Sequence, residues 1–446
     1  MLFPVATLRS TTFYWLNKKM NHSISQYGGI AVVVCMGALL PLAANAQVLE
    51  QLISAALASH PSAQGQRAQL ESAEAGVDGA RWQFYPTPSV TVETASASAT
   101  DRLYQGDRRV STLRLQQPLW TGGRLSAGLD KAEAGVSLSQ ASLEEVRQQL
   151  GLRVVQAYGD WYSAHLKTLA IEKSQETHLR LREQVKRRIG EGASSQSDLA
   201  LAVARLESVV SDAAAARAQR DISLARLSQL LGRAVAGASL LGSLAEPQDL
   251  RGPTQALLDQ ALTINPAVQK AQAQAKVQEA VIDERRADYS PEVYARLERQ
   301  YGNYNFPNGA PENRLFIGLN TRFGAGFSLG ANIEAARAQH QAALAEVEVQ
   351  SRSVTEQVLS DHALALSAQS RVASIKASLQ AAADVSESYD RQFLAGRKSW
   401  LDVMNAAREL AQTETQLADL HSTQVVVTWR LAIYTRGVAS VIEKTP

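Results

Sequence analysis

The stretch QFLAGRKSWLDVMNA, residues Gln392–Ala406, ends one helical pattern and starts another. Gly396 lies between the two helical patterns, at the break. Ser399 and Asp402 follow with the Ser-x-x-Asp spacing of a capping box, in which the serine accepts from a first-turn amide and the acid complements the helix dipole. The stretch therefore predicts a tight turn between two antiparallel helices.

A similar turn occurs 204 residues earlier, where GASSQSDL (192–199) aligns with GRKSWLDV (396–403) and places Asp198 on Asp402. Other segments align at offsets of 203 to 205: His60-Pro61 with Asn265-Pro266, Tyr85-Pro86 with Ser290-Pro291, and PLWTGG (118–123) with TRFGAG (321–326). An offset that stays within two residues over half of the chain indicates two copies of one unit.

Each copy predicts a short helix, two strands, a long helix and a second short helix, because apolar residues recur at the 3-and-4 spacing of packed helices on both sides of alternating segments. The predicted helices are Leu49–Arg81, Arg124–Ile189 and Ser197–Leu231, then Pro253–Ala287, Leu329–Leu394 and Trp400–Thr435. The predicted divisions are a signal peptide (1–46), the first repeat (47–232), an irregular connection (233–252), the second repeat (253–437) and a C-terminal tail (438–446).

The N-terminal 46 residues are typical of an export signal. Lys18 and Lys19 precede the apolar run Ile30–Leu42, and Ala44-Asn45-Ala46 forms a small-x-small cleavage site. The only cysteine, Cys35, lies in this segment, so the exported chain would contain no disulfide. An uncleaved membrane anchor is the alternative, although the apolar run is short for a spanning helix.

Composition excludes several classes of protein. The chain is 45% hydrophobic but only 6% aromatic, as in long helices packed through small residues. The leader holds three cations and no acid, so the rest of the +2 chain carries 42 cations and 43 acids. A nearly neutral body excludes a typical nucleic-acid-binding protein. The histidines lack metal-ligand spacing and no catalytic motif is present, so we expect no enzyme activity, no metal and no cofactor.

Four segments alternate between polar and apolar residues, at about 87–96, 109–119, 291–301 and 313–323. Their lengths suit strands that cross an outer membrane at a tilt. Aromatic residues near their ends are typical of a belt at the membrane interface: Trp82, Phe84, Tyr85, Trp120, Tyr289, Phe323 and Phe327. Soluble hairpins packed on helices are the alternative.

The number of strands predicts an oligomer. A closed membrane barrel needs about eight strands or more, and an open sheet in lipid would leave unpaired backbone groups that cost several kcal/mol each. Four strands per chain therefore require several chains, and three chains would give twelve strands. The fold class expected is mainly α, with a membrane β-barrel portion built from the duplicated unit.

On these features the sequence resembles the TolC family of outer-membrane channels over nearly all of residues 47–437. The motifs that carry the resemblance are the duplicated layout, Tyr85-Pro86, PLWTGG and YDRQFLAGRKSWLDVMNAAREL (389–410), and the last is most similar to the type I secretion branch, the LapE/AggA-like adhesin exporters. The resemblance implies a homotrimer with a twelve-stranded barrel in outer-membrane lipid and a periplasmic α-helical barrel. It also implies three partners: a periplasmic adaptor (membrane fusion protein), an inner-membrane ABC transporter and a secreted protein substrate.

The resemblance also assigns roles at the helical tip. It implies a pore constriction at Asp402, with Asn405 in place of a second acid, and a latch of Arg397 or Lys398 with Asp198 and Ser197 of the neighbouring coil. The positions expected to contact the adaptor are Gly192, Gly396, Ser399, Trp400 and Leu401. Packing beneath the turn is an equally good role for Trp400. The alternatives for the whole chain are the outer-membrane channel of a multidrug efflux pump and, in another class, a periplasmic coiled-coil adaptor.

Overall fold

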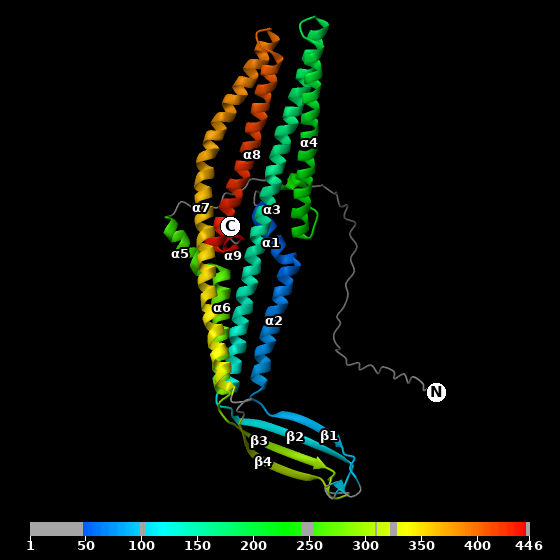
Figure 1. Cartoon of the computed structure of the whole chain (residues 1–446), viewed down its shortest axis with the longest axis vertical. Helices are drawn as coiled ribbons and strands as arrows, with labels where there is room; N and C mark the ends of the chain where they lie inside the picture. Colours follow the sequence, from blue (N-terminus) through cyan, green and yellow to red (C-terminus); the bar gives the residue numbers. More distant parts are fainter. Residues whose placement is uncertain are drawn as a thin grey trace, which may run out of the picture. The chain divides into compact units, whose positions relative to one another are not determined.

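The computed structural model describes residues 48–98, 101, 104–241, 253–307, 310–321 and 328–442. The predicted leader and the aromatic residues Phe323 and Phe327 lie outside these residues. In the first half, the helices are α1 (Val48–Ser59), α2 (Pro61–Trp82), α3 (Arg124–Gly190) and α4 (Gln196–Leu231), and the strands are β1 (Thr87–Thr94) and β2 (Arg109–Trp120) (Figure 1). The 3-10 helix η2 (Gly237–Leu240) follows α4.

The second half repeats the first element by element. It contains α5 (Thr254–Ile264), α6 (Pro266–Ala287), β3 (Glu292–Tyr301), β4 (Glu312–Asn320), α7 (Leu329–Leu394) and α8 (Trp400–Arg436), followed by α9 (Val438–Ile442). The helices α2 and α6 both have 22 residues, and the long helices have 67 and 66. The predicted duplicated unit and fold class are confirmed.

The first predicted helix of each copy is in fact two helices. The chain breaks at His60 and Asn265, whose extended backbones cap α2 and α6, and a proline follows at the first helical position of each. Proline has no N–H to continue the preceding helix but fits the first turn of a new one. The side chains of His60 and Asn265 accept from the amides of Ser62 and Ala267, which gives both copies the same corner.

The long helices organise the helical layer. The helix α3 contacts α2 along one part of its length and α4 along another, and α7 does the same with α6 and α8 (Figure 1). The two halves meet because α3 also contacts α6 and α8. Each long helix therefore runs beside two shorter ones, and each long helix and its following partner form a helical hairpin with its turn at the end far from the strands.

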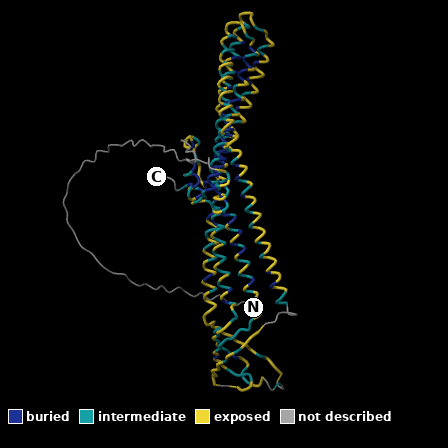
Figure 2. The backbone as a smooth tube through the Cα atoms, turned by 90° about the vertical axis from the view of Figure 1, so that its left-hand side faces the viewer, coloured by how far each residue is buried: buried dark blue, intermediate teal, exposed yellow. Residues whose placement is uncertain are grey.

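Buried residues are densest near the middle of the helical layer (Figure 2). There α1, η2 and α9 pack on α3, α4 and α8 around Tyr158 and Trp161, both 1% exposed. At Gly159 of α3, a Cβ would lie 2.1 Å from Cγ2 of Val426 in α8, and Ser422 Oγ donates to the Gly159 carbonyl over 2.7 Å. The backbone of α3 and the side chains of α8 thus approach as closely as a glycine permits.

The four strands form one antiparallel sheet in the order β1-β2-β3-β4. Strand β2 pairs with β3 despite their separation in sequence, with Arg114 opposite Glu298, and this pairing joins the two copies. Strands β1 and β4 are the edges, and among the described residues each pairs with a single strand. Within the described part of the chain, no helix is long and apolar enough to cross a membrane.

Candidate functional site

The two hairpin turns share one backbone design. Gly192 and Gly396 have positive φ angles of 75° and 72°, which only glycine adopts without strain. The amide of Gly192 donates to Ile189 O and that of Gly396 to Phe393 O, at 3.0 and 2.9 Å. The next amides, of Ala193 and Arg397, reach back to the carbonyls five residues earlier over 2.7 and 2.8 Å. Both long helices thus end in a Schellman motif.

Both following helices begin with a capping box. Ser195 and Ser399 accept from the amides of Asp198 and Asp402 over 3.1 and 3.2 Å, and each carboxylate accepts from the serine amide in return. The Ser195 amide is the largest cause of a lowered pKa of Asp198. The Ser399 hydroxyl is the largest cause of a lowered pKa of Asp402, with Lys398 a smaller one. Both acids are therefore held as anions, and capping accounts for the Ser-x-x-Asp spacing.

A buried cluster joins the four helices beneath these turns. Its members are Leu181 and Val185 of α3, Ala202 of α4, Phe393 of α7, and Trp400, Val403 and Met404 of α8. Trp400 is 8% exposed, and its indole also donates to the carboxylate of Asp198 at the start of α4. Of the two roles considered for Trp400, burial supports packing beneath the turn.

A second link between the hairpins comes from Arg188. Its Nη1 donates to the carbonyl of Phe393 over 2.8 Å, and its guanidinium carbon lies 4.7 Å from the centre of the Phe393 ring. Arg188 is near the end of α3 and Phe393 near the end of α7. The first hairpin therefore holds the last turn of the second by both a hydrogen bond and a cation–π contact.

The proposed latch residues lie around these links. Lys398 Nζ is 4.0 Å from Asp402 Oδ2 and 4.2 Å from the centre of the Tyr389 ring, whereas the carboxylate of Asp198 accepts from Ser195 and Trp400. Asn405 Oδ1 accepts from Arg408 Nη2 over 3.4 Å. The exposed predicted tip residues are Gly192, Ser197, Gly396, Arg397, Ser399, Leu401 and Asn405.

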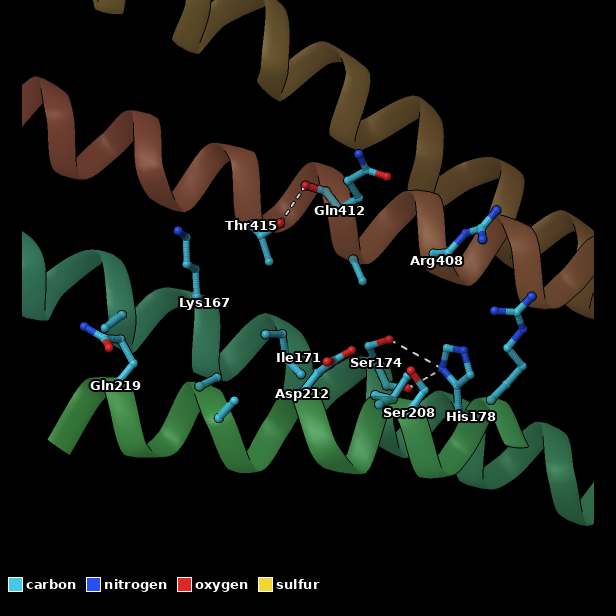
Figure 3. A pocket seen from close by; sticks show the side chains of 16 residues that line it. Lys167, Ile171, Ser174, His178, Ser208, Asp212, Gln219, Arg408, Gln412 and Thr415 are labelled. Atoms are coloured by element: carbon cyan, nitrogen blue, oxygen red, sulfur yellow. Dashed lines mark hydrogen bonds between the residues drawn. The ribbon is translucent and has the colours of Figure 1, made fainter. Parts of the chain in front are cut away.

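A groove of about 660 Å³ lies between α3, α4 and α8 (Figure 3). Its lining combines small and aliphatic side chains such as Ile171 with the charged groups of Lys167, Asp212 and Arg408. His178 is buried at its edge and donates from Nδ1 to the Ser174 carbonyl over 2.8 Å. The two hairpins thus form an open groove on one face, lined by both apolar and charged side chains.

The sheet has an unusual distribution of side chains, with its apolar face exposed. Ile317 is 76% exposed and Val90 69%, whereas the carboxylate-bearing Glu298 is 9% exposed. The large apolar residues exposed on this face are Val90, Val92, Leu113, Leu115, Leu297, Leu315, Ile317 and Leu319. Their cross-strand partners place them on one side, and Arg114, Gln116, Arg296 and Glu298 lie on the other. Soluble sheets bury their apolar face, so this sheet is built for an apolar surrounding.

Five of the seven predicted aromatic residues are described, and all five are exposed where helices and strands join: Trp82, Phe84, Tyr85, Trp120 and Tyr289. The rings of Trp82 and Tyr85 have centroids 5.2 Å apart. Their position beside the exposed apolar face agrees with the predicted belt, because indole and phenol groups favour the boundary between lipid and water.

Residues 52–233 and 257–432 match the family model described as "Outer membrane efflux protein". The chain belongs to this family. Its members are outer-membrane channels rather than enzymes, so the predicted TolC-like family and outer-membrane location are confirmed. A comparison with curated protein sequences finds no significant match.

Solved structures of other outer-membrane channels share this fold. CusC is 19% identical, with a TM-score of 0.74 over 87% of this chain and 92% of that one. VceC of Vibrio cholerae is 17% identical, with a TM-score of 0.73 over 87% and 96%. MtrE of Neisseria gonorrhoeae, solved in an open state, is 18% identical, with a TM-score of 0.71 over 88% and 90%. At these identities the likeness shows the fold alone.

Sequence reasoning missed two features of this chain. Arg188 carried no motif, and the residue aligned with it at the offset of 204 is Gln392 rather than Phe393. The pairing of Arg114 with Glu298 required the β2–β3 register, which joins strands 184 residues apart. Both contacts join one repeat to the other, and such contacts leave no pattern within a single segment.

Proposed function

We propose that this protein is the outer-membrane exit duct of a type I secretion system. As a homotrimer, it would pass a protein substrate, including a large adhesin, from an inner-membrane ABC transporter and a periplasmic adaptor to the exterior. The observation that carries a membrane duct is the sheet with an exposed apolar face and two open edges. Three such sheets would close a twelve-stranded barrel, satisfy both edges and turn the apolar faces to lipid.

A pair of neighbouring substitutions tests the membrane sheet. Val90 points to the apolar face of β1 and Thr91 to the polar face. An arginine on the lipid side costs about 2–4 kcal/mol at the middle of the bilayer. Val90→Arg should therefore deplete trimers from the outer membrane, whereas Thr91→Arg should not. Equal recovery of both variants would favour a periplasmic protein with a solvated sheet, the alternative from another class.

The proposal of type I secretion is supported by the resemblance of residues 389–410 to adhesin exporters. The alternative is the channel of a multidrug efflux pump. Deletion of the gene should remove one or more proteins from the culture medium and leave drug susceptibility unchanged, and a plasmid copy should restore secretion. Hypersensitivity to several drugs, with an unaltered set of secreted proteins, would instead identify an efflux channel.

At the tip we propose that Gly192, Gly396, Ser399 and Leu401 contact the adaptor, supported by their exposure at the hairpin turns. Trp400 would hold this surface from beneath. We also propose that three copies of Asp402, with Asn405 one turn later, line the constriction, where neighbouring carboxylates attract cations.

The proposed latch joins Arg397 or Lys398 to Asp198, with Ser197 beside it, across neighbouring coils. An exposed pair of this kind contributes about 0–1 kcal/mol, so a docking adaptor can release it. Asp198→Lys should raise the conductance of the trimer in a planar bilayer, because it places like charges together. Asp212→Lys, on the same helix and also exposed, is the matched control. Unchanged conductance of the Asp198 variant would rule out the latch.

A further inference from the structure

At the centre of the polar face Arg114 and Arg296 face the single carboxylate of Glu298, whereas Glu93, Glu292 and Glu312 lie toward the ends of the strands. Arg114 Nε lies 2.7 Å from Glu298 Oε1, and Arg296 Nε lies 3.1 Å from the same oxygen. The carboxylate of Glu298 is therefore the acidic partner of both arginines. Arg314 is directly opposite Glu298 on β4 and pairs with Glu312 and with Gln300 Oε1.

The two arginine side chains are more exposed than the glutamate that they contact. The exposed fractions of the Arg114 and Arg296 side chains are 40% and 25%, whereas that of Glu298 is 11%. The guanidinium carbon of Arg296 lies 4.6 Å from the centre of the Phe316 ring, which fixes its position. With two arginines for one less exposed carboxylate, the accessible surface at this level carries a net positive charge.

We propose that these arginines form an anion-attracting belt inside the barrel, which engages carboxylate-rich segments of the polypeptide in transit. This inference rests on the proposed function, because barrel closure turns the polar face to the lumen and repeats the belt in all three copies. Arginine is suited to this role, because its planar fork binds carboxylates in two-point contacts.

In the barrel the belt would line the lumen, so it would hold a passing chain by several weak contacts at once. Contacts of this kind are screened by salt, with a Debye length of about 10 Å at 0.1 M. An acidic segment would therefore be drawn into the barrel without being retained. A basic segment would be repelled at the same level.

The test is block of the purified trimer in a planar bilayer by poly-L-glutamate, added on the side of the strands. The triple variant Arg114→Gln, Arg296→Gln, Glu298→Gln removes both cations together with their shared anion, so no buried carboxylate is left unpaired. We expect its half-blocking concentration to rise by about tenfold, the size produced by losing several partly exposed ion pairs. Glu298→Gln alone uncovers both arginines and should shift block in the opposite direction.

Arg299→Gln is the matched control, because Arg299 lies on the same strand but points to the other face. It should be blocked like the wild type. The inference is overturned if the triple variant is blocked like the wild type, or if Arg299→Gln changes block as much. A wild-type protein that forms no trimeric pore overturns the proposed function, and the belt with it, whereas pores that poly-L-glutamate does not block overturn the belt alone.

Discussion

The turn after α3 and the turn after α7 have the same backbone, but their side chains differ in what they contact. Both end in a Schellman motif and restart with a capping box. The first helical residue is the exposed Gln196 in one copy and the buried Trp400 in the other. The two copies thus share the interactions that end and restart their helices. The contacts between the hairpins instead depend on side chains that differ between the copies.

The largest difference is expected at that position. Trp400→Ala removes a buried ring and a donor to Asp198, so it should lower the free energy of local unfolding at the tip by about 3–5 kcal/mol. Gln196→Ala, the equivalent change in the other copy, should stay within about 0.5 kcal/mol. Hydrogen exchange of segments 181–205 and 389–407 measures both. Similar loss of protection in the two variants would mean that the copies are interchangeable here.

The next largest effect is expected at Arg188 of the first hairpin. Its side chain contacts the end of α7 in the second hairpin. Arg188→Ala should cost about 1–2 kcal/mol, because it removes a charged hydrogen bond and a cation–π contact that are only half-buried. The loss should appear as faster exchange of the Gly396 and Arg397 amides, which close the second turn. Arg187→Ala, an exposed neighbour, is the control. If the amides of Gly192 and Ala193 were affected instead, the contact would act within its own hairpin.

A smaller effect, equal in the two copies, is expected when the capping serines are replaced. Ser195→Ala and Ser399→Ala each remove one acceptor from a first-turn amide, at a cost of about 1 kcal/mol. Helix protection just after each turn should fall to the same extent. A clearly larger loss for Ser399→Ala would show that the second capping box does more than cap its helix.

The smallest effect is the pH dependence of the two aspartates. The fold lowers both pKa values from 3.8, so each anion stabilises the tip above that pH, and this stability is lost as the pH falls through the folded pKa. Asp198→Asn and Asp402→Asn should each flatten the loss of tip protection below about pH 4. Titration by hydrogen exchange with pH-corrected rates tests this. An unaltered profile in both variants would assign the acid sensitivity to other groups.

The sequence predicts elements well where a local rule decides them. The bounds of α7, Leu329–Leu394, are as predicted, and the turns at Gly192 and Gly396 follow from glycine and Ser-x-x-Asp. The break at His60 was missed because the helical pattern continues on both sides of the proline. The partners of Trp400 and Glu298 could not be predicted, since each depends on how the two repeats pack together.

The close approach at Gly159 determines how the hairpins can part. Because Gly159 has no Cβ, α3 is in tight contact there with Val426 and Ser422 of α8. This contact joins the two hairpins and acts as the pivot about which they can tilt. From it to the turn at Gly192, α3 forms an arm of roughly 50 Å at about 1.5 Å per residue, so a tilt of about 5° swings the tip by about 4 Å. A gate at that end would need only slight bending in the middle, with the packing around Gly159 left in place, together with separation of the buried cluster around Trp400.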